Sequence, residues 1–223
     1  MATDAALFAL SKNLAPSFEV LGGKVPALIV DNFYAHPDAL RAFALDQSFE
    51  APPYPYPGRL AAAPESSASL RNARRWVLEV ANREFLSRVP PIEHSGRRLT
   101  AFSQLYTDFA VVDVHPDDLS HTQRIPHTDP VPVFGLVYLN HEARGGTLFF
   151  EQKAQPPATD KEGGYMTKST AAFELCARIE AVFNRLVIYP GFVPHSGDIS
   201  GEWIRTDERY SNPRLTQRFA FLP

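Results

Sequence analysis

Two short stretches of the sequence contain residue types that bind transition metals. His127 and Asp129 stand two residues apart between Pro126 and Pro130, and His195 ends the apolar run RLVIYPGFVPH. In a β-strand, residues i and i+2 face the same side, with Cα atoms roughly 6.5–7 Å apart. An imidazole and a carboxylate at this spacing can therefore converge on one ion, whereas in a helix they would point in nearly opposite directions. The two prolines favour a strand end or a barrel rim.

The three residues together would supply two imidazoles and one carboxylate. This ligand set, with open coordination positions, is typical of non-haem Fe(II) oxygenases. His195 follows an apolar strand, which is expected to carry it to the rim of the same barrel. The alternative at this point is that unrelated polar residues share the spacing by coincidence.

The other histidines are weaker candidates for a metal site. His115 also forms an i, i+2 pair, with Asp113, but it runs directly into Pro-Asp-Asp. That tripeptide is a turn signature and predicts a solvated loop. The rest fall at an expected helix start, in polar loops or in a turn: His36, His94, His121 and His141.

The last apolar stretch, NPRLTQRFAF, carries a possible anion site. In a strand, Arg214, Thr216 and Arg218 share one face, and the other face holds Leu215, Phe219 and Phe221. An arginine followed two residues later by a hydroxyl can clamp a carboxylate, because the guanidinium binds bidentately and the hydroxyl adds a third bond. Arg218 is followed at this spacing by Ala220, so Arg214 is the better candidate. The alternative is an outward-facing polar stripe.

From about Thr100 the chain consists of short β-like runs separated by turn residues. Such a series predicts an all-β sandwich or barrel. Gly145-Gly146 is expected to form a hairpin turn that needs positive φ, and the stretch YMTKSTAAFELCARI is expected to form a short helix or lid. The predicted strands are LTAFSQLYT, FAVVDV, VFGLVYLN, GTLFFEQ, RIEAVF, RLVIYPG and RLTQRFAFL.

The first third of the chain alternates strand and helix signals. Two strands are expected around Gly22-Gly23, followed by a helix with Pro37 at its first position. The proline-rich segment 51–59 predicts an ordered loop, and the stretch NARRWVLEVANREFLSRV predicts a second helix. We expect one domain over residues 1–223, in which residues 1–99 support a metal-bearing barrel formed by residues 100–223.

Composition narrows the classes of partner and compartment. Lys and Arg number 22 and Asp and Glu number 25, which leaves no basic footprint for nucleic acid or an anionic membrane. Cys176 is the only cysteine, which fits a reducing compartment. The start of the sequence does not have the pattern of a signal peptide, and no apolar run is long enough to span a membrane. We therefore expect a cytoplasmic protein without nucleic-acid or membrane partners.

The motifs together resemble a known family. PHTDP, GLVYLN, GGTLFF, RLVIYPGFVPHSGD and the terminal RLT, in this order, are similar to the Fe(II)- and 2-oxoglutarate-dependent dioxygenases of prolyl-hydroxylase-like type. The resemblance covers roughly residues 100–223. It implies a mainly β fold with flanking helices, in which a double-stranded β-helix (a jelly-roll, cupin-like barrel) carries the metal at its open end.

The resemblance also implies cofactors and residue roles. Fe(II), 2-oxoglutarate and O₂ would be used to hydroxylate a small molecule, an amino acid or a peptide side chain. The catalytic Fe(II) would be held by His127, Asp129 and His195, and the distal carboxylate of 2-oxoglutarate by Arg214, Thr216 and Tyr106. The gap of 19 residues between His195 and Arg214 is longer than is usual in the family, which leaves the choice between Arg214 and Arg218 open.

Two other functions fit parts of the same pattern. A cupin-like metal enzyme that does not use 2-oxoglutarate would share the three metal-binding residues but would not need the clamp at Arg214. A non-catalytic barrel that acts as a binding module would not need all three metal-binding residues.

Overall fold

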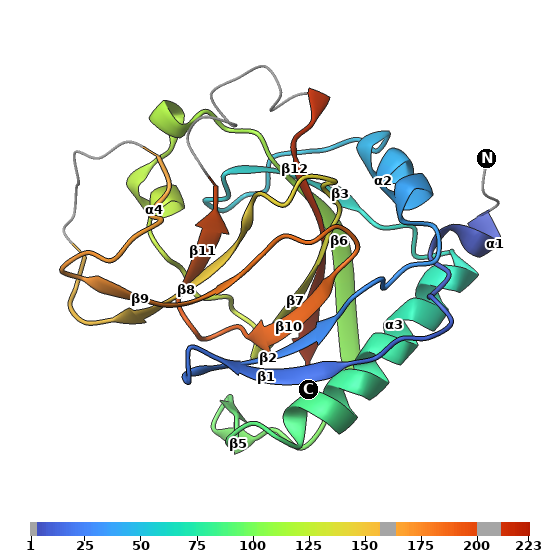
Figure 1. The fold of residues 1–223 in the computed structure, drawn as a ribbon, viewed down its shortest axis with the longest axis horizontal. Helices are drawn as coiled ribbons and strands as arrows, with labels where there is room; N and C mark the ends of the chain where they lie inside the picture. Colours follow the sequence, from blue (N-terminus) through green and yellow to red (C-terminus); the bar gives the residue numbers. More distant parts are fainter. Residues whose placement is uncertain (1–3, 157–163, 200–210) are drawn as a thin grey trace.

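A computed structural model gives the fold and describes residues 4–156, 164–199 and 211–223. Two facing β-sheets form its centre, and the helices α1, α2 and α3 pack on one outer side (Figure 1). The helical segments are α1 (Asp4–Leu7), α2 (Pro37–Leu45), α3 (Ala68–Val80), the π-helix η1 (Ala81–Leu86), the 3₁₀ turn η2 (Pro116–Asp118) and α4 (His121–Arg124). The strands are β1 (Ser17–Leu21), β2 (Val25–Val30), β3 (Gly58–Ala62), β4 (Glu93–His94), β5 (Arg97–Arg98), β6 (Gln104–Val112), β7 (Val133–Tyr138), β8 (Gly146–Gln152), β9 (Phe173–Ile179), β10 (Leu186–Pro190), β11 (His195–Asp198) and β12 (Arg214–Leu222).

The strand order identifies the barrel. The larger sheet has the order β1-β2-β10-β7-β12-β6-β3 and the smaller sheet the order β11-β8-β9, with antiparallel pairing throughout. His127 adds a bridge to His195 beside β11. From β6 onward the chain therefore passes between the two sheets in the sequence of a double-stranded β-helix, a jelly-roll barrel. The predicted fold class is confirmed.

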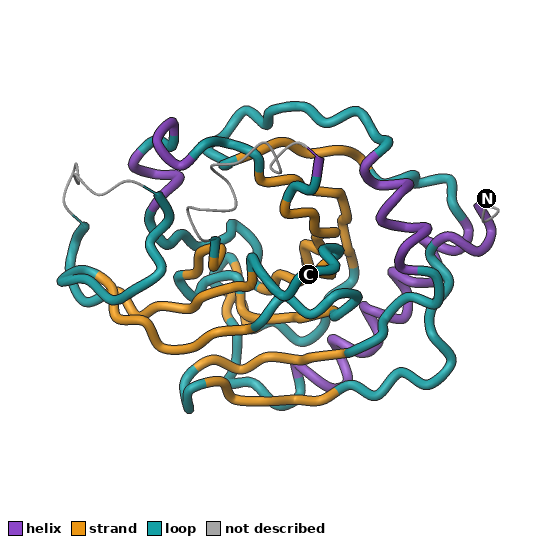
Figure 2. Tube along the Cα trace, turned by 45° about the horizontal axis from the view of Figure 1, so that its top comes forward, coloured by secondary structure: helices purple, strands orange, loops and turns teal. Residues whose placement is uncertain are grey.

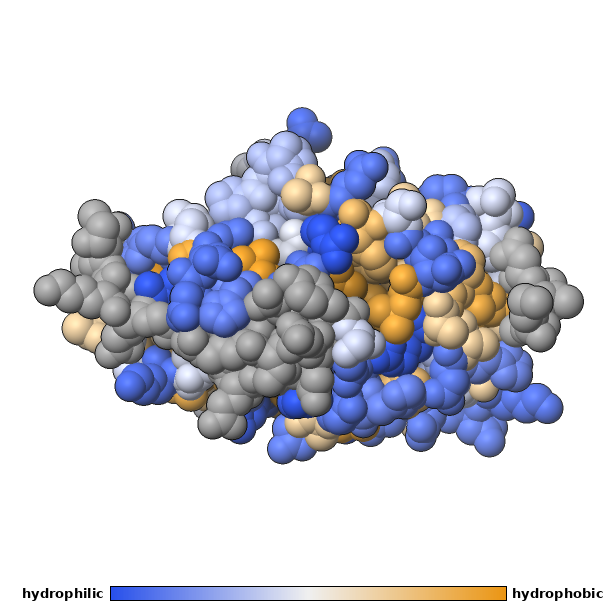
Figure 3. Space-filling view, turned by 90° about the horizontal axis from the view of Figure 1, so that it is seen from above, coloured by the Kyte–Doolittle hydropathy of each residue, from blue (hydrophilic) through white to orange (hydrophobic). Residues whose placement is uncertain are grey.

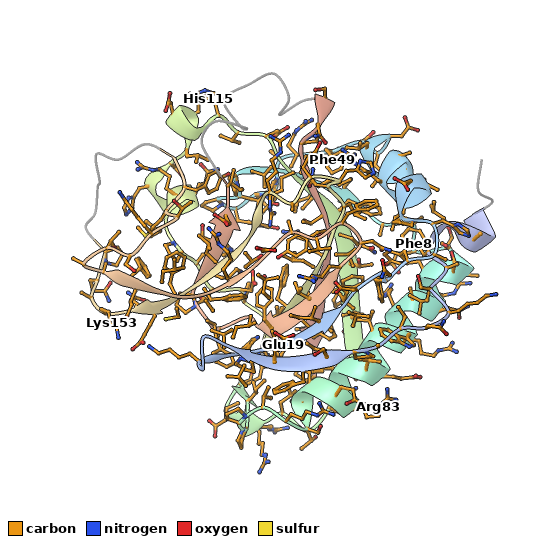
Figure 4. All side chains as sticks on the ribbon, viewed as in Figure 1. Phe8, Glu19, Phe49, Arg83, His115 and Lys153 are labelled. Atoms are coloured by element: carbon orange, nitrogen blue, oxygen red, sulfur yellow. The ribbon has the colours of Figure 1, made fainter. Side chains whose placement is uncertain are left out.

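The N-terminal part of the chain extends the barrel as well as covering it. β1 and β2 continue the larger sheet beyond β10, and β3 continues it beyond β6. α1, α2 and α3 gather on the outer face of this sheet, as the purple segments on the right of Figure 2 show, whereas α4 lies on the other side of the molecule. The main core fills the space between helices and sheet, and it contains Phe8, Leu70, Ala73, Val77, Phe109, Leu215, Phe219 and Phe221. Phe8 is labelled in this layer in Figure 4.

A second core lies between the two sheets. Its members come from both walls of the barrel, and they include Leu136, Tyr138, Phe149, Ile179, Val187 and Tyr189. The barrel is thus closed by packed side chains over part of its length, and β12 takes part in both layers because its alternate residues face opposite sides.

Local sequence explains where the two longer helices begin. Pro37 is the first residue of α2, where a missing N–H leaves no bond unmade. The Ser67 side chain accepts a hydrogen bond from the backbone N–H of Leu70 and so caps α3. Both helices, and the two strands around Gly22-Gly23, agree with the sequence prediction.

Three predicted elements are wrong in detail. The residues of β9 were expected to form a short helix or lid, but they pair with β8 along its length. The predicted strand RIEAVF shares only Arg178 and Ile179 with β9 before the chain turns. The two predicted strands LTAFSQLYT and FAVVDV are one strand, β6, because Asp108 continues the ladder with β12.

The surface seen from above the barrel is mixed in character. Figure 3 shows polar atoms over most of this side and apolar atoms gathered in an area right of centre. In the described residues, no helix combines the length and the apolar character needed to cross a membrane.

Candidate metal centre

The three predicted metal-binding residues lie together at one end of the barrel. The backbones of His127 and His195 bond to each other in both directions, N–H to carbonyl, at 2.9 and 2.8 Å. The backbone N–H of Asp129 bonds to the carbonyl of Gly191 at 2.8 Å. These bonds fix the two segments side by side, so that one ligand atom from each of the three side chains lies within 4.8 Å of the others.

The hydrogen bonding of His195 prepares one ring nitrogen for a metal. Its Nδ1 lies 2.9 Å from the carbonyl oxygen of Val193, which can only accept, so Nδ1 carries the proton in the neutral ring. The lone pair of Nε2 then faces the Oδ2 of Asp129 at 3.2 Å. Two ligands at right angles on one ion, each about 2.1 Å from it, stand about 3 Å apart. The separation of these two atoms therefore fits a shared metal ion.

The Asp129 carboxylate adds a second observation. Its Oδ2 is inaccessible to solvent and has no hydrogen-bond donor among the described residues. A buried carboxylate oxygen without a donor is costly unless a cation compensates it. Two imidazoles and this carboxylate fit an ion such as Fe(II), which accepts nitrogen and oxygen ligands together.

The His127 ring is held in its neutral form. Removal of the ring from water lowers its pKa to about 4, and the nearby His195 acts in the same direction against the charge of Asp129. The residue as a whole is exposed, but its ring lies only 4.5 Å from that of His195, centre to centre. A neutral imidazole is the form that binds metals.

A cavity of about 650 Å³ opens beside the three residues. Arg214, Thr216 and Arg218 from the inner face of β12 also line it. The sequence prediction that these three side chains share one face is confirmed by their position opposite Val112, Ala110 and Asp108 of β6. The cavity therefore contains both the candidate metal residues and the candidate anion site. The remaining wall is largely aromatic and aliphatic, with Tyr54, Tyr56, Val131, Phe134, Tyr165 and Tyr189 among its members.

Arg214 is buried without a counter-ion. It is 7% exposed, its Nε donates to the Gly145 carbonyl at 2.5 Å, and its Nη2 donates to the Gly146 carbonyl at 3.4 Å. No carboxylate pairs with it among the described residues. A buried guanidinium whose charge is not neutralised is destabilising unless an anion binds.

Among the described residues, the Thr216 hydroxyl also has no partner, whereas Arg218 has a counter-ion. The Oγ1 of Thr216 is inaccessible and has no hydrogen-bond partner among the described residues, and the residue is 1% exposed. Arg218, in contrast, makes a two-point ion pair with Asp108, at 2.7 and 2.6 Å. Of the two arginines considered, Arg214 is therefore the one left to bind an anion.

Tyr106 does not reach this end of the cavity, which corrects the prediction. It stands opposite Ala220, six residues along β12 from Arg214, a distance of roughly 20 Å. Its side chain is 55% exposed and its hydroxyl donates to Gln104. The sequence pattern gave the correct face of β6 but not the position along the strand.

Two tyrosines that the sequence reasoning missed lie closer to the anion site. Tyr165 lines the cavity, and its hydroxyl oxygen is inaccessible and has no hydrogen-bond partner among the described residues. Burial raises the pKa of both Tyr165 and Tyr56, so each hydroxyl stays protonated and able to donate. Tyr56 belongs to the proline-rich loop, and nothing in that pattern signals that its ring turns inward.

The competing pair, Asp113 and His115, lies outside the cavity. The Asp113 carboxylate accepts two bonds from Arg59, and the Nδ1 of His115 accepts from the backbone N–H of Asp117 at the start of η2. Figure 4 shows His115 at the upper edge of the molecule. The predicted turn is therefore confirmed.

Glycine shapes the turn that supports Arg214. Gly145 has a φ of 82°, as predicted for this hairpin, and a Cβ there would come within 2.9 Å of the Arg214 side chain. Gly146 does not have the positive φ that was predicted for it. It starts β8, and its small size is needed because a Cβ would meet the Ile179 carbonyl at 2.2 Å.

Part of the long gap between His195 and Arg214 lies outside the described residues, because residues 200–210 are not described.

Comparisons with known proteins give one family and several structural relatives. The model of a family of unknown function (DUF6445) matches residues 12–221. A comparison with curated proteins gave no match. A prolyl-4-hydroxylase from Pseudomonas putida is similar in structure, with a TM-score of 0.41 and 16% identity over 83% of this chain and 86% of that one. A bsmA homologue from Methylobium petroleophilum has a TM-score of 0.36 and 12% identity over 94% of this chain and 77% of that one. IDO from Bacillus thuringiensis has a TM-score of 0.30 and 13% identity over 99% of this chain and 83% of that one.

Proposed function

Because the chain belongs to a family of unknown function (DUF6445), its activity must be inferred from the site, and we propose that it is an Fe(II)- and 2-oxoglutarate-dependent dioxygenase. In this proposal His127, Asp129 and His195 hold Fe(II). Arg214 and Thr216 bind the distal carboxylate of 2-oxoglutarate. The substrate is a small molecule, an amino acid or a peptide side chain, and it is hydroxylated.

One observation carries the proposal: a buried arginine that has no counter-ion among the described residues shares a cavity with two histidines and an aspartate. A metal enzyme that acts without an anionic co-substrate would not need a buried arginine at the position of Arg214. Burying an unpaired guanidinium costs several kcal/mol in general, so its presence favours a bound anion. The unpartnered hydroxyl of Thr216, two residues along the same face, supplies a further donor for that anion.

The residues of the chain have separate tasks in the proposed complex. When bound, the metal and 2-oxoglutarate would activate O₂, because oxidation of the co-substrate to succinate and CO₂ supplies two electrons and takes up one oxygen atom, and the other oxygen atom is inserted into a substrate C–H bond. Arg214 sets the position and direction of the co-substrate through its charge and its planar donors. The Val193 carbonyl keeps the His195 ring in the tautomer that presents Nε2.

Tyr165 takes the role that the resemblance suggested for Tyr106. Its hydroxyl lies in the cavity wall with no hydrogen-bond partner among the described residues. It is protonated because burial raises its pKa, so it donates to the co-substrate carboxylate.

Spectroscopy without oxygen tests the proposal directly. Fe(II) and 2-oxoglutarate added together to the full chain should give the weak visible charge-transfer band of a chelated keto acid. Fe(II) with succinate, which has no keto group, is the matched control and should give no band. A folded, iron-loaded protein that shows no band with 2-oxoglutarate would favour a cupin-like enzyme that does not use this co-substrate.

A further inference from the structure

The second arginine of β12 lies in the same cavity but has a different electrostatic environment. Arg218 and Arg214 both point inward from one strand face. Arg218 is paired through Nε and Nη2 with the two oxygens of Asp108, directly across the ladder between β12 and β6. The charge of this guanidinium is therefore balanced within the protein, which leaves it a hydrogen-bond donor rather than an uncompensated cation.

One edge of the Arg218 guanidinium remains available. Within the described part of the chain, Nη1 has no hydrogen-bond partner, and the Tyr54 hydroxyl stands 3.5 Å from Nη2, where a bond is weak. The Tyr56 ring covers one face of the guanidinium at 5.2 Å from its centre. Asp108 and Tyr56 together hold the plane of the group, so the free Nη1 edge has a fixed direction.

Strand register places Arg218 toward the metal end of the cavity. Arg214 bonds to Gly145 and Gly146, and Gly146 stands opposite Asp198, whereas His195 stands opposite Phe149. From there β12 runs toward the start of β7, the strand that follows Asp129, because Thr216 stands opposite Tyr138 and Phe221 opposite Val133. Arg218 lies four residues further along, roughly 13 Å from Arg214 between Cα atoms.

The wall around this end is apolar rather than charged. It contains residues of the proline-rich loop, together with residues that follow Asp129 and one from β7: Tyr54, Pro55, Pro57, Pro130, Val131 and Phe134. A ligand that fills this space is thus surrounded by aromatic and aliphatic groups. Arg218 lies beside this wall, next to Tyr54 and Tyr56, and is therefore placed to orient such a ligand.

We infer that Arg218 determines substrate specificity, and that the substrate is an uncharged, largely apolar molecule whose carbonyl oxygen accepts a hydrogen bond from Nη1. This inference rests on the proposed function for the identity of the reaction. A carboxylate at the same position would share the guanidinium with Asp108 and would be repelled by it, because the ion pair has no net charge to offer. A neutral carbonyl, such as an amide, needs only the donor.

Two isosteric probes test the charge preference. Phenylacetamide and phenylacetate carry the same ring and the same carbonyl, but only the second is an anion. Titrated into the full chain with Fe(II) and 2-oxoglutarate under anaerobic conditions, phenylacetamide should perturb the charge-transfer band with an affinity about tenfold higher than that of phenylacetate, the scale of one hydrogen bond to a charged group. Equal or stronger binding of phenylacetate overturns the inference, and so does failure of both probes to bind.

Variants of Arg218 test whether its guanidinium causes the preference for phenylacetamide over phenylacetate. Arg218→Gln should weaken phenylacetamide binding about tenfold while the affinity for 2-oxoglutarate changes by less than about twofold. The double variant Asp108→Asn, Arg218→Gln removes both charges together and should give the same loss if the single variant folds poorly. Arg59→Gln is the matched control, because Arg59 makes a similar pair with Asp113 outside the cavity. Unchanged affinity for phenylacetamide in either Arg218 variant contradicts the assignment.

The two proposals fail in different ways. Absence of the charge-transfer band in the wild-type protein counts against the co-substrate and leaves the Arg218 site untouched. Ligand-observed NMR on the full chain without added metal then measures binding of the same two probes. Loss of the amide preference in that measurement counts against the Arg218 site alone.

Discussion

The polar residues of the cavity differ in whether another residue balances their charge or accepts or donates their hydrogen bonds. Within residues 4–156, 164–199 and 211–223, Asp129 has an oxygen without a donor and Arg214 a charge without a counter-ion, whereas Asp108 balances the charge of Arg218 and fixes its orientation. Uncompensated groups are costly in the isolated protein. At the scale of single residues they therefore favour binding of a cation at the first and of an anion at the second.

Asp129→Ala should abolish tight iron binding. The substitution removes the anionic ligand of the set, and two neutral imidazoles alone hold Fe(II) weakly. Iron per protein after reconstitution and desalting, measured by elemental analysis, should fall to the background level. Asp113→Ala is the control, because Asp113 pairs with Arg59 outside the cavity and should leave the iron content unchanged. Equal iron content in the two variants would refute the ligand assignment.

Arg214→Gln should weaken 2-oxoglutarate binding by about 2–5 kcal/mol, the scale for truncating one partner of a buried charge pair. The same change should raise the free energy of unfolding of the ligand-free protein, because it removes an unpaired buried charge. Titration of the charge-transfer band measures the first effect, and urea denaturation measures the second. Arg185→Gln removes a guanidinium that pairs with the exposed Asp31, and it should leave 2-oxoglutarate affinity unchanged. A variant of Arg214 with wild-type affinity would rule this residue out.

Thr216→Val, like Arg214→Gln, should stabilise the ligand-free protein and weaken the binding of 2-oxoglutarate. The Oγ1 of Thr216 is buried and has no hydrogen-bond partner in the described part of the chain, so its replacement by a methyl group should stabilise the ligand-free protein by about 1 kcal/mol. The 2-oxoglutarate complex should lose about 1 kcal/mol of binding free energy, because one donor is gone. Urea denaturation with and without 2-oxoglutarate measures both quantities on one protein. If the ligand stabilises the variant as much as the wild type, the hydroxyl does not contact it.

At the scale of elements, the turn before β8 positions Arg214. Gly145→Ala should cost about 1–2 kcal/mol of stability, since an alanine at φ 82° is strained. It should also weaken 2-oxoglutarate binding, because the new Cβ lies within 2.9 Å of the Arg214 side chain.

Gly96→Ala controls for the strain alone. Gly96 has a φ of 74°, and a Cβ there would meet nothing within 4 Å. It should lose similar stability, measured by urea denaturation, and keep its 2-oxoglutarate affinity, measured by titration. A Gly145 variant that binds as tightly as the Gly96 variant would show that the turn does not position the arginine.

Strand faces were predictable from the sequence, and strand positions were not. Alternation along β12 correctly placed Leu215 and Thr216 on opposite faces, because a strand has a fixed two-residue period. Tyr106 has the correct face of β6 but lies at the wrong end, because register depends on pairing with a strand more than a hundred residues away. The alanines and leucine near β9 suggest a helix, yet pairing with β8 overrides that local preference.

The residues of the candidate site could be predicted where their types, their spacing and their order along the chain were informative. His127, Asp129, His195 and Arg214 were selected by type, spacing and order, and the structure brings them to one cavity. Tyr165 was missed because it starts the stretch that was expected to form a short helix or lid, and no strand alternation there shows which way its ring points. The ion pair between Arg218 and Asp108 could not be predicted either, because the sequence does not show which charged residues form ion pairs in the folded chain.

At the scale of the whole molecule, the cavity depends on a sheet that the N-terminal part completes. The inner face of β12 carries the polar residues of the site, and its outer face packs on α1, α3 and β6 through the main core. β1, β2 and β3 add strands at both edges of the same sheet. We therefore expect residues 1–223 to fold as one cooperative unit, although the barrel itself begins near Thr100.

A fragment of residues 100–223 should fail to fold. Without the first 99 residues, Leu215, Phe219 and Phe221 would face water on one side of the sheet, and each buried aromatic side chain contributes about 1.5–3 kcal/mol. β6 and β10 would also become edge strands with unpaired backbone groups, which promotes aggregation. Circular dichroism and the dispersion of amide NMR signals, compared with the full chain, measure the outcome. A fragment that shows native dispersion and still binds iron would demonstrate that the barrel is an independent domain.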